Sequence, residues 1–187
     1  MNAATSRGSV RIVVVVVGGR DAAGLQEQAL SIYQDIGSRL GEATALNDLG
    51  RVRSLTGDYP AAAGLLERSV ALFREVGDAQ GEAEALNATG ALLAVSAGPR
   101  EALAVYRRAL QLARQGGSPL EEARALEGAA RCAARSGDQV AARAGLSEAA
   151  AIYQRIGAAE ARPAAADLAA TDKDARGNDP FQESCIN

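Results

Sequence analysis

The sequence predicts an all-α protein, a solenoid of stacked helical hairpins, and three observations lead to this prediction. A block of 40 residues, Gly41–Gln80, recurs without a gap as Gly81–Leu120 and as Glu121–Glu160. Both halves of each block place apolar and small residues at helical spacing. A glycine ends the second half of every copy. A fixed period of this length is typical of solenoids, in which each unit buries its apolar face only against its neighbours.

The first half of each block is predicted to form a helix with a small-residue face. The residues that carry this face are Leu46, Leu86 and Leu126, followed four residues later by Gly50, Gly90 and Ala130. Small residues at these positions let a second helix approach closely. A Gly-Asp pair follows at Gly57-Asp58 and Gly137-Asp138. Glycine can adopt the left-handed conformation that ends a helix, and aspartate can cap the next one.

The second half of each block is predicted to form another helix of about 15 residues, roughly four turns. Its first column holds only alanine, and its last column holds only glycine. The residues are Ala22, Ala62, Ala102 and Ala142 in the first column, and Gly37, Gly77, Gly117 and Gly157 in the last. The upstream copy, Asp21–Ile36, has no well-formed partner before it. The chain is therefore expected to hold a half repeat, three full repeats and a short cap helix at Ala161–Ala170.

This pattern resembles the tetratricopeptide repeat, most closely at Gly57-Asp58-Tyr59 with Ala62. The resemblance covers Asp21 to Glu160, and it implies a superhelix of helical hairpins. The unit here has 40 residues rather than the usual 34, as in a longer-repeat branch of the family. The chain departs from the family pattern in having no tryptophan and in carrying Gln139 where tyrosine is usual. The wording of the repeats also resembles the C-terminal arrays of bacterial antibiotic-regulatory and nucleotide-binding transcription regulators.

The sequence divides into three predicted regions. Residues 1–20 are expected to be disordered or a degraded first helix of repeat one, residues 21–170 to form the solenoid, and residues 171–187 to form a disordered tail. The apolar run Val10–Val17 allows other interpretations. It lacks a clear cleavage site for a signal peptide and is too short to span a membrane. It imitates a nucleotide-binding strand, but the glycine spacing after it is wrong. A short strand or an irregular apolar plug stays possible.

Composition argues against several classes of function. The chain has 187 residues, 20 basic and 23 acidic, and a net charge of −3, which is too balanced for a surface that binds nucleic acid or an anionic membrane. It contains no histidine, the commonest general base and metal ligand. Its two cysteines, Cys132 and Cys185, cannot form a zinc site or a disulfide framework. We therefore expect a cytoplasmic protein without cofactor, metal or catalytic residues.

The candidate binding residues lie on the first helices, off their predicted core face. In tetratricopeptide arrays these helices line the concave surface, so the resemblance places a peptide-binding face there. The residues are Thr44, Asn47, Arg51, Glu84, Asn87, Arg124, Glu127 and Arg131. Asn47 and Asn87 share a column, and an asparagine amide suits the backbone of an extended peptide. The alternatives are that the asparagines satisfy local carbonyl groups and that the arginines pair with Glu84 and Glu127.

The sequence thus predicts a non-catalytic scaffold that binds a protein or peptide. The resemblance suggests a sensor or regulatory module of a bacterial signalling or transcription-regulation system. Two alternatives remain: a solenoid that self-assembles through its uncapped ends, and a remnant of a larger regulator without independent activity. An enzyme, or a precursor with its substrate around Cys185, is disfavoured because no nucleophile lies beside a base.

Overall fold

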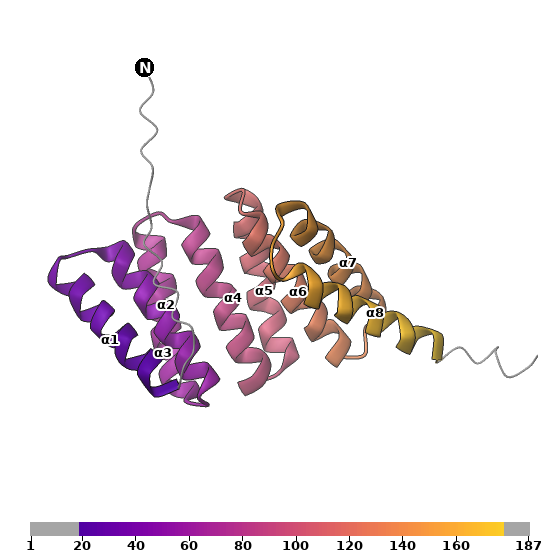
Figure 1. The fold of residues 1–187 in the computed structure, drawn as a ribbon, viewed down its shortest axis with the longest axis horizontal. Helices are drawn as coiled ribbons and strands as arrows, with labels where there is room; N and C mark the ends of the chain where they lie inside the picture. The colour runs from indigo at the N-terminus through magenta and orange to yellow at the C-terminus, as the bar shows by residue number, and fades with distance from the viewer. Residues whose placement is uncertain (1–18, 178–187) are drawn as a thin grey trace, which may run out of the picture.

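The computed structural model describes residues 19–177, with side chains described for residues 23–171. This range holds eight helices. They are α1 (Gly19–Asp35), α2 (Arg39–Leu55), α3 (Tyr59–Glu75), α4 (Ala79–Ser96), α5 (Pro99–Gln115), α6 (Pro119–Arg135), α7 (Gln139–Ile156) and α8 (Ala161–Gly177). Figure 1 shows them side by side in a row, from α1 at one end to α7 and α8 at the other. The predicted helical-hairpin solenoid is confirmed.

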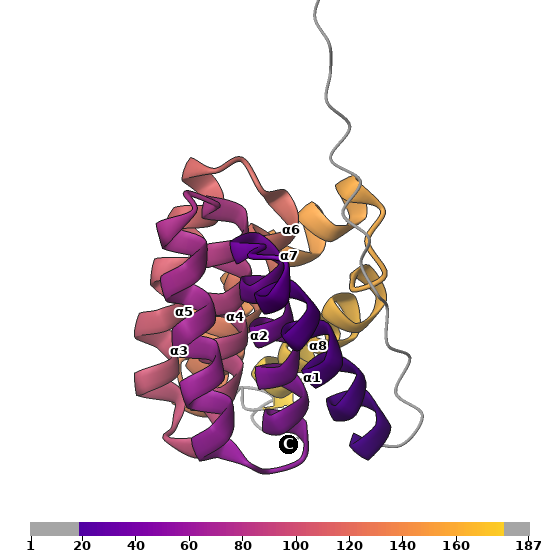
Figure 2. The ribbon, with the colours of Figure 1, turned by 90° about the vertical axis from the view of Figure 1, so that its left-hand side faces the viewer.

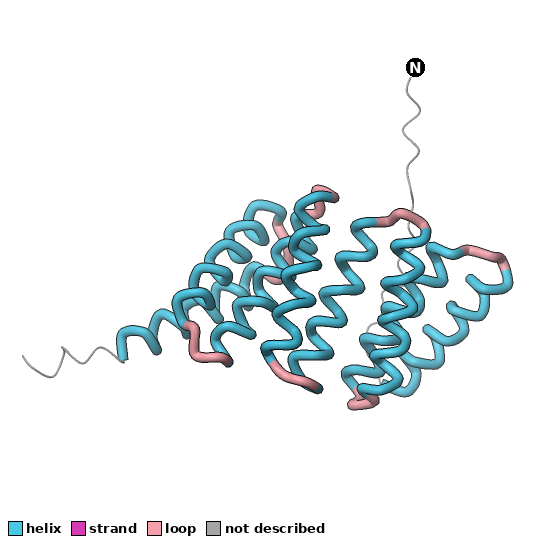
Figure 3. The backbone as a smooth tube through the Cα atoms, turned by 180° about the vertical axis from the view of Figure 1, so that it is seen from behind, coloured by secondary structure: helices cyan, strands magenta, loops and turns pink. Residues whose placement is uncertain are grey.

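Consecutive helices pack against each other, and the first helices of the repeats, α2, α4 and α6, also contact one another in turn. Figure 2, seen from the α1 end, shows α3 and α5 on one side of the row and α2 and α4 beside them. Short loops join the helices at alternating ends (Figure 3). The helices α2, α4 and α6 therefore form one continuous layer, and the candidate site opens on it.

The turns before α2, α3, α4 and α7 each combine a glycine that ends one helix with a side chain that caps the next. At the end of α3, Gly77 has a φ of 73°, which only glycine adopts without strain. The following amide, of Asp78, donates to the Phe73 carbonyl oxygen at 2.9 Å. The Asp78 side chain then accepts from the Gly81 amide at 3.0 Å and caps α4. Aspartates 58 and 138 cap α3 and α7 in the same way.

An aromatic ring at the end of each of two second helices rests on a glycine at the start of the next helix. A Cβ atom on Gly81 would lie 2.3 Å from the Phe73 ring, and a Cβ atom on Gly41 would lie 2.2 Å from the Tyr33 ring. The third copy reverses both sizes, with Ala113 at the ring position and Glu121 at the glycine position. A ring at the first position therefore goes with a glycine at the second. In the third copy a small residue replaces the ring and a larger residue replaces the glycine.

The last helix differs from the sequence prediction in its length. The cap was expected at Ala161–Ala170 with a tail from Thr171, but α8 continues to Gly177. The Thr171 hydroxyl donates to the Asp167 carbonyl oxygen at 2.9 Å, and Thr171 is buried. The predicted boundary at residue 170 is therefore too early. The expectations for Val10–Val17 and Cys185 concern residues outside the described range.

None of the helices within residues 19–177 combines the length and the apolar character that a membrane span requires.

The ring-on-glycine contact leads to a first prediction. Gly81→Ala should lower the free energy of unfolding by about 1–3 kcal/mol, because the added methyl group collides with the Phe73 ring in a packed interface. The matched control is Gly64→Ala in the neighbouring α3, where nothing lies within 4 Å of an added Cβ. This control should raise stability by about 0.5–1 kcal/mol through helix propensity. Urea unfolding followed by circular dichroism measures both; equal effects of the two variants would contradict the packing argument.

Candidate functional site

A groove of about 400 Å³ opens on the inner layer of helices, in the middle of the row. Its walls come from α2, α4 and α6, with side chains from α5 and α7 and from the loop before α8. The lining residues are Arg51, Ser54, Leu55, Glu84, Asn87, Ala88, Ala91, Tyr106, Glu121, Arg124, Glu127, Gly128, Arg131, Tyr153 and Glu160. The volume lies within the range of small-molecule and peptide side-chain pockets.

Six of the eight residues singled out in the sequence line this groove. They are Arg51, Glu84, Asn87, Arg124, Glu127 and Arg131. The other two, Thr44 and Asn47, lie outside it. Thr44 donates its hydroxyl to the Leu40 carbonyl oxygen within its own helix at 3.0 Å. Asn47 is only 1% exposed, so its amide is a core group rather than a surface one.

The side-chain amide of Asn87 is hydrogen-bonded through its nitrogen atom, whereas its oxygen atom has no partner within the described residues. Its Nδ2 donates to the backbone oxygen and to Oε2 of Glu121, both at 3.0 Å. Because both partners are acceptors, the orientation of the amide is fixed. Its Oδ1 is buried and has no hydrogen-bond partner within the described residues. A buried acceptor without a donor is costly, and the Oδ1 atom of Asn47, which lies outside the groove, is in the same state.

The arginines of the groove are paired inside the protein. Arg124 contacts Glu121 at 2.9 Å and Glu160 at 2.7 Å. Arg131 contacts Glu127 at 2.8 Å and Asp167 at 2.7 Å. The sequence alternative, in which the arginines pair with Glu84 and Glu127, therefore holds for Arg131 with Glu127, whereas Arg124 pairs with Glu121 and Glu160 instead. The alternative is weaker for Arg51, which is half exposed and reaches Glu84 only at 3.8 Å.

The pKa values of two carboxyl groups of the groove, those of Glu160 and Glu121, are shifted in opposite directions. The hydrogen bond from Arg124 is the main cause that lowers the pKa of Glu160. Burial is the main cause that raises the pKa of Glu121, although Asn87 and Arg124 oppose it. Glu160 therefore stabilises the fold above its unfolded-state pKa and loses this contribution as the pH falls. Glu121 behaves in the opposite sense, and its contribution is lost as the pH rises through its folded-state pKa.

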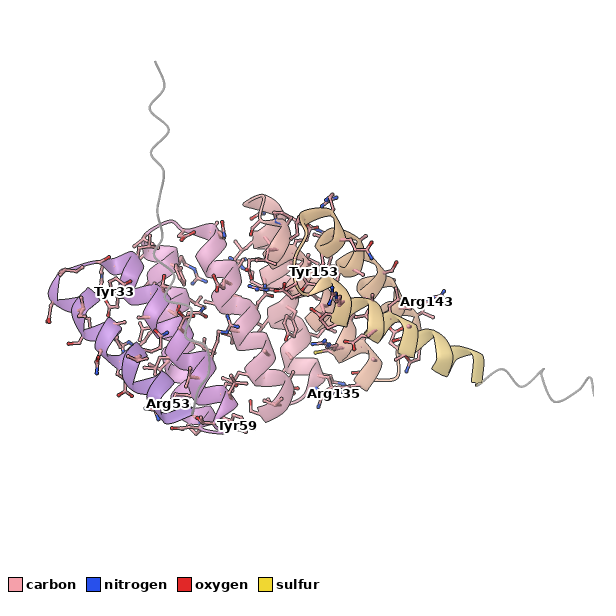
Figure 4. The ribbon with its side chains drawn as sticks, in the orientation of Figure 1. Tyr33, Arg53, Tyr59, Arg135, Arg143 and Tyr153 are labelled. Atoms are coloured by element: carbon pink, nitrogen blue, oxygen red, sulfur yellow. The ribbon has the colours of Figure 1, made fainter. Side chains whose placement is uncertain are left out.

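Tyr153 supports the groove from below. Its side chain is fully buried in α7, and its hydroxyl donates to Glu127 Oε2 at 2.8 Å. Burial is the main cause that raises its pKa, so the phenol stays protonated. In Figure 4, Tyr153 lies near the centre of the molecule, whereas Tyr59, Arg53 and Arg135 lie along its lower edge. Tyr153 thus packs in the core and also orients Glu127 through this hydrogen bond.

Tyr106 is one of the groove residues that sequence analysis missed, along with Ser54, Leu55, Glu121 and Glu160. It belongs to α5, a second helix, and stands where the flanking repeats have Leu66 and Leu146. A Cβ atom on Gly90 would lie 2.8 Å from its ring, and a Cβ atom on Gly128 would lie 2.3 Å from it. The available signal was the coincidence of a tyrosine in a leucine column with Gly128 in the column of Ala88. The ring needs both glycines to reach the groove.

The described residues contain no cluster of His, Cys, Asp and Glu side chains that could hold a metal ion. The chemistry of the groove therefore comes from amide, hydroxyl, guanidinium and carboxylate groups alone.

Comparison with known proteins identifies the kind of fold. Residues 19–75 match the family model of the tetratricopeptide repeat. A solved Rap protein complexed with Competence and Sporulation Factor superposes with a TM-score of 0.76 at 17% identity, over 85% of this chain and 45% of that one. The apo form of RapI gives 0.71 at 14% identity, again over 85% and 45%. BtubC from P. vanneervenii gives 0.70 at 15% identity, over 83% and 66%.

The helices and these neighbours together define a tetratricopeptide-like helical solenoid. At these identities, the likeness to the solved structures concerns the fold alone. The chain spans less than half the length of the two Rap structures. No curated protein sequence matches the chain.

The fit of Tyr106 between two glycines gives a second prediction. Gly128→Ala should destabilise the protein by about 1–3 kcal/mol, because the new Cβ would overlap the ring. Adding Tyr106→Leu should restore most of this loss, since Leu66 already packs with Ala88 at the equivalent contact of the preceding repeat. A double-mutant cycle of urea unfolding measures the coupling, expected at about 0.5–3 kcal/mol for residues in contact. Additive effects would show that the ring and Gly128 do not share this space.

Proposed function

We propose that this chain is a non-catalytic scaffold whose groove binds a peptide or an extended segment of a protein. The observation that supports this proposal is the Oδ1 atom of Asn87, a buried acceptor without a partner in the wall of the groove. An extended peptide offers one backbone N–H group for every residue, so it can supply the missing donor. Arg51, the least engaged arginine of the groove, can bind a carboxylate of the same ligand.

The regulatory part of the proposal rests on resemblance. A Rap structure of similar fold contains Competence and Sporulation Factor, so a solenoid of this shape can hold a signalling factor. The repeats of this chain resemble the sensor arrays of bacterial transcription regulators. We therefore place it in a bacterial signalling or transcription-regulation system in the cytoplasm, with a protein or peptide partner and with no nucleic acid, membrane or cofactor of its own.

A peptide selected from a random decapeptide display library on the wild-type chain tests the groove. Asn87→Ala should weaken binding of that peptide by about 5- to 30-fold, because loss of a hydrogen bond to a buried group costs about 1–2 kcal/mol. The matched control is Asn47→Ala, which changes the same residue type in the same column but outside the groove. Fluorescence anisotropy measures both affinities, and circular dichroism checks that both variants fold.

An unchanged affinity of the Asn87→Ala variant, or an equal loss in both variants, would place the peptide outside the groove and contradict the proposal.

A second candidate function, self-assembly, is favoured by the outer face of α1. Ile32 is 58% exposed, whereas Leu72 and Ile152, in the same column, are 8% and 6% exposed. Leu25 on α1 and Ile36, directly after its end, are also exposed. This face lacks, within the described residues, the first helix that covers its counterparts in the other repeats. A second copy of the chain could cover it and extend the solenoid.

Self-assembly predicts a mass above the 19.1 kDa of one chain at about 100 μM, a concentration at which micromolar contacts are populated. Ile32→Glu should then return the protein to the monomer, because it would bury a charge in an apolar contact. Val140→Glu is the control, since Val140 is 83% exposed on α7 at the other end of the row. Light scattering coupled to gel filtration measures the mass. A wild-type monomer at this concentration would rule this candidate out.

A further inference from the structure

We propose that Tyr106 is a ligand-binding residue of the groove, whose hydroxyl donates a hydrogen bond to the carbonyl oxygen of an uncharged amide in the ligand. This inference rests on the proposed function, since it needs an occupant of the groove. It goes further by naming the group that the central part of the groove takes. That group is neutral, although the groove contains three arginines.

Tyr106 reaches the groove from the layer of second helices, not from the layer of α2, α4 and α6 that forms most of its lining. It belongs to α5, a second helix, and these helices lie behind the layer that lines the groove. Its ring passes between α4 and α6 at Gly90 and Gly128, the two positions where a Cβ atom would meet it. Leu66 meets only one such glycine, Gly50, at the equivalent contact of the preceding repeat. Both helices, α4 and α6, therefore carry glycine where the longer, polar side chain of Tyr106 passes between them.

The Tyr106 hydroxyl lacks a partner. The residue is 7% exposed and lines the groove, yet no hydrogen bond joins its hydroxyl to another group of the described residues. The Tyr153 hydroxyl, by contrast, donates a hydrogen bond to Glu127. Burial raises the pKa of Tyr106 to about 12, so the phenol is a neutral donor at physiological pH. The hydroxyl is not among the buried polar atoms without a partner, which within the described residues are the Oδ1 atoms of Asn47 and Asn87, so it is accessible to a group in the groove.

Asn87, in the lining of the same groove, has an acceptor atom that lacks a donor. Its Oδ1 is a buried acceptor without a donor, on a residue only 8% exposed. One unpaired donor and one unpaired acceptor match the C=O and N–H groups of an amide. The lining of the groove also includes Ala88, Ala91 and Gly128, which have no polar side-chain atoms. Hydrogen bonds gain strength in such a weakly polar setting.

A carboxylate fits this part of the groove poorly. Arg124 and Arg131 each already contact two carboxylates of the protein. Glu121 and Glu127 lie in the same wall and are buried, so they would repel another anion. An uncharged amide avoids both the repulsion and the cost of burying an unpaired charge. Two sources carry this group, the peptide backbone and the side chain of Asn or Gln, and two probes distinguish them.

The test uses the full chain with 13C-labelled tyrosine and 15N-labelled asparagine, observed by NMR. The chain has four tyrosines, so the ring signals separate readily. The backbone probe is N-acetylalanine N′-methylamide, the side-chain probe is propionamide, and the charged probe is acetate. A neutral fragment of about ten heavy atoms should bind with a Kd of several millimolar, at roughly 0.3 kcal/mol per atom. Titration to about 50 mM therefore approaches saturation for the backbone probe, and propionamide, with about half as many heavy atoms, is titrated to about 500 mM.

We expect at least one amide probe to shift the Tyr106 ring and the Asn87 side-chain amide saturably, while the rings of Tyr33 and Tyr59 do not move. Acetate should leave Tyr106 unmoved. Tyr106→Phe should weaken the binding followed at Asn87 by about 3- to 10-fold, the effect of one hydrogen bond. Tyr59→Phe is the matched control and should bind as the wild type does.

A merely structural Tyr106 gives a different set of results. In that case Tyr106→Phe leaves amide binding at Asn87 unchanged, and the inference is overturned while the proposed function stands. A saturable response of Tyr106 to acetate alone, or to none of the three probes, overturns it as well. The affinity of the selected decapeptide for the Asn87→Ala variant tests the proposed function separately. The unfolding midpoint of Tyr106→Phe should not fall, since the hydroxyl has no partner within the described fold.

Discussion

Close approach between helices, made possible by residues without a Cβ atom, is the constraint on which this structure depends. The chain has only 3% aromatic residues and no tryptophan, so alanine and leucine fill most of the core. Two of the few rings pack directly against glycines: Phe73 rests on Gly81, and Tyr106 passes between Gly90 and Gly128. Each contact ties one helix to the start or middle of the next. Because packed interiors tolerate little overlap, a single methyl group at these glycines would force helices apart.

The same constraint creates the groove. In the third copy, Ala113 replaces the ring and Glu121 replaces the glycine. The Glu121 carboxylate and backbone oxygen then accept hydrogen bonds from the Asn87 amide. Arg124 joins this carboxylate to Glu160, and Arg131 joins Glu127 to Asp167 on α8. The groove is thus lined by charged groups that largely neutralise one another. What remains unpaired is neutral, namely the Tyr106 hydroxyl and the Asn87 oxygen.

This arrangement gives the proposed scaffold a definite chemistry. Ion pairs between the arginines and α8 are partly exposed, so they contribute little to stability, yet they fix the shape of one wall. A ligand then meets a wall that is already organised, which lowers the entropic cost of binding. Contacts of a peptide with Asn87, Tyr106 and Arg51 would draw on three helices, α4, α5 and α2, from two different repeats of the solenoid. A binding site of this kind exists only when the repeats are stacked.

The sequence by itself determined the hairpin solenoid, because period, helical spacing and the Gly-Asp turns are local properties that every copy repeats. Six of the eight candidate residues line the groove, since a helix face follows from spacing alone; that they bind a ligand stays a prediction. The sequence could not separate Asn47 from Asn87, which share a column. The equivalent of Glu121, the partner of Asn87, is Gly81 for Asn47, and that glycine supports the Phe73 ring instead. Only the tertiary structure decided this, and only it showed Tyr106 in the groove, because both outcomes depend on which side chains are missing on a neighbouring helix.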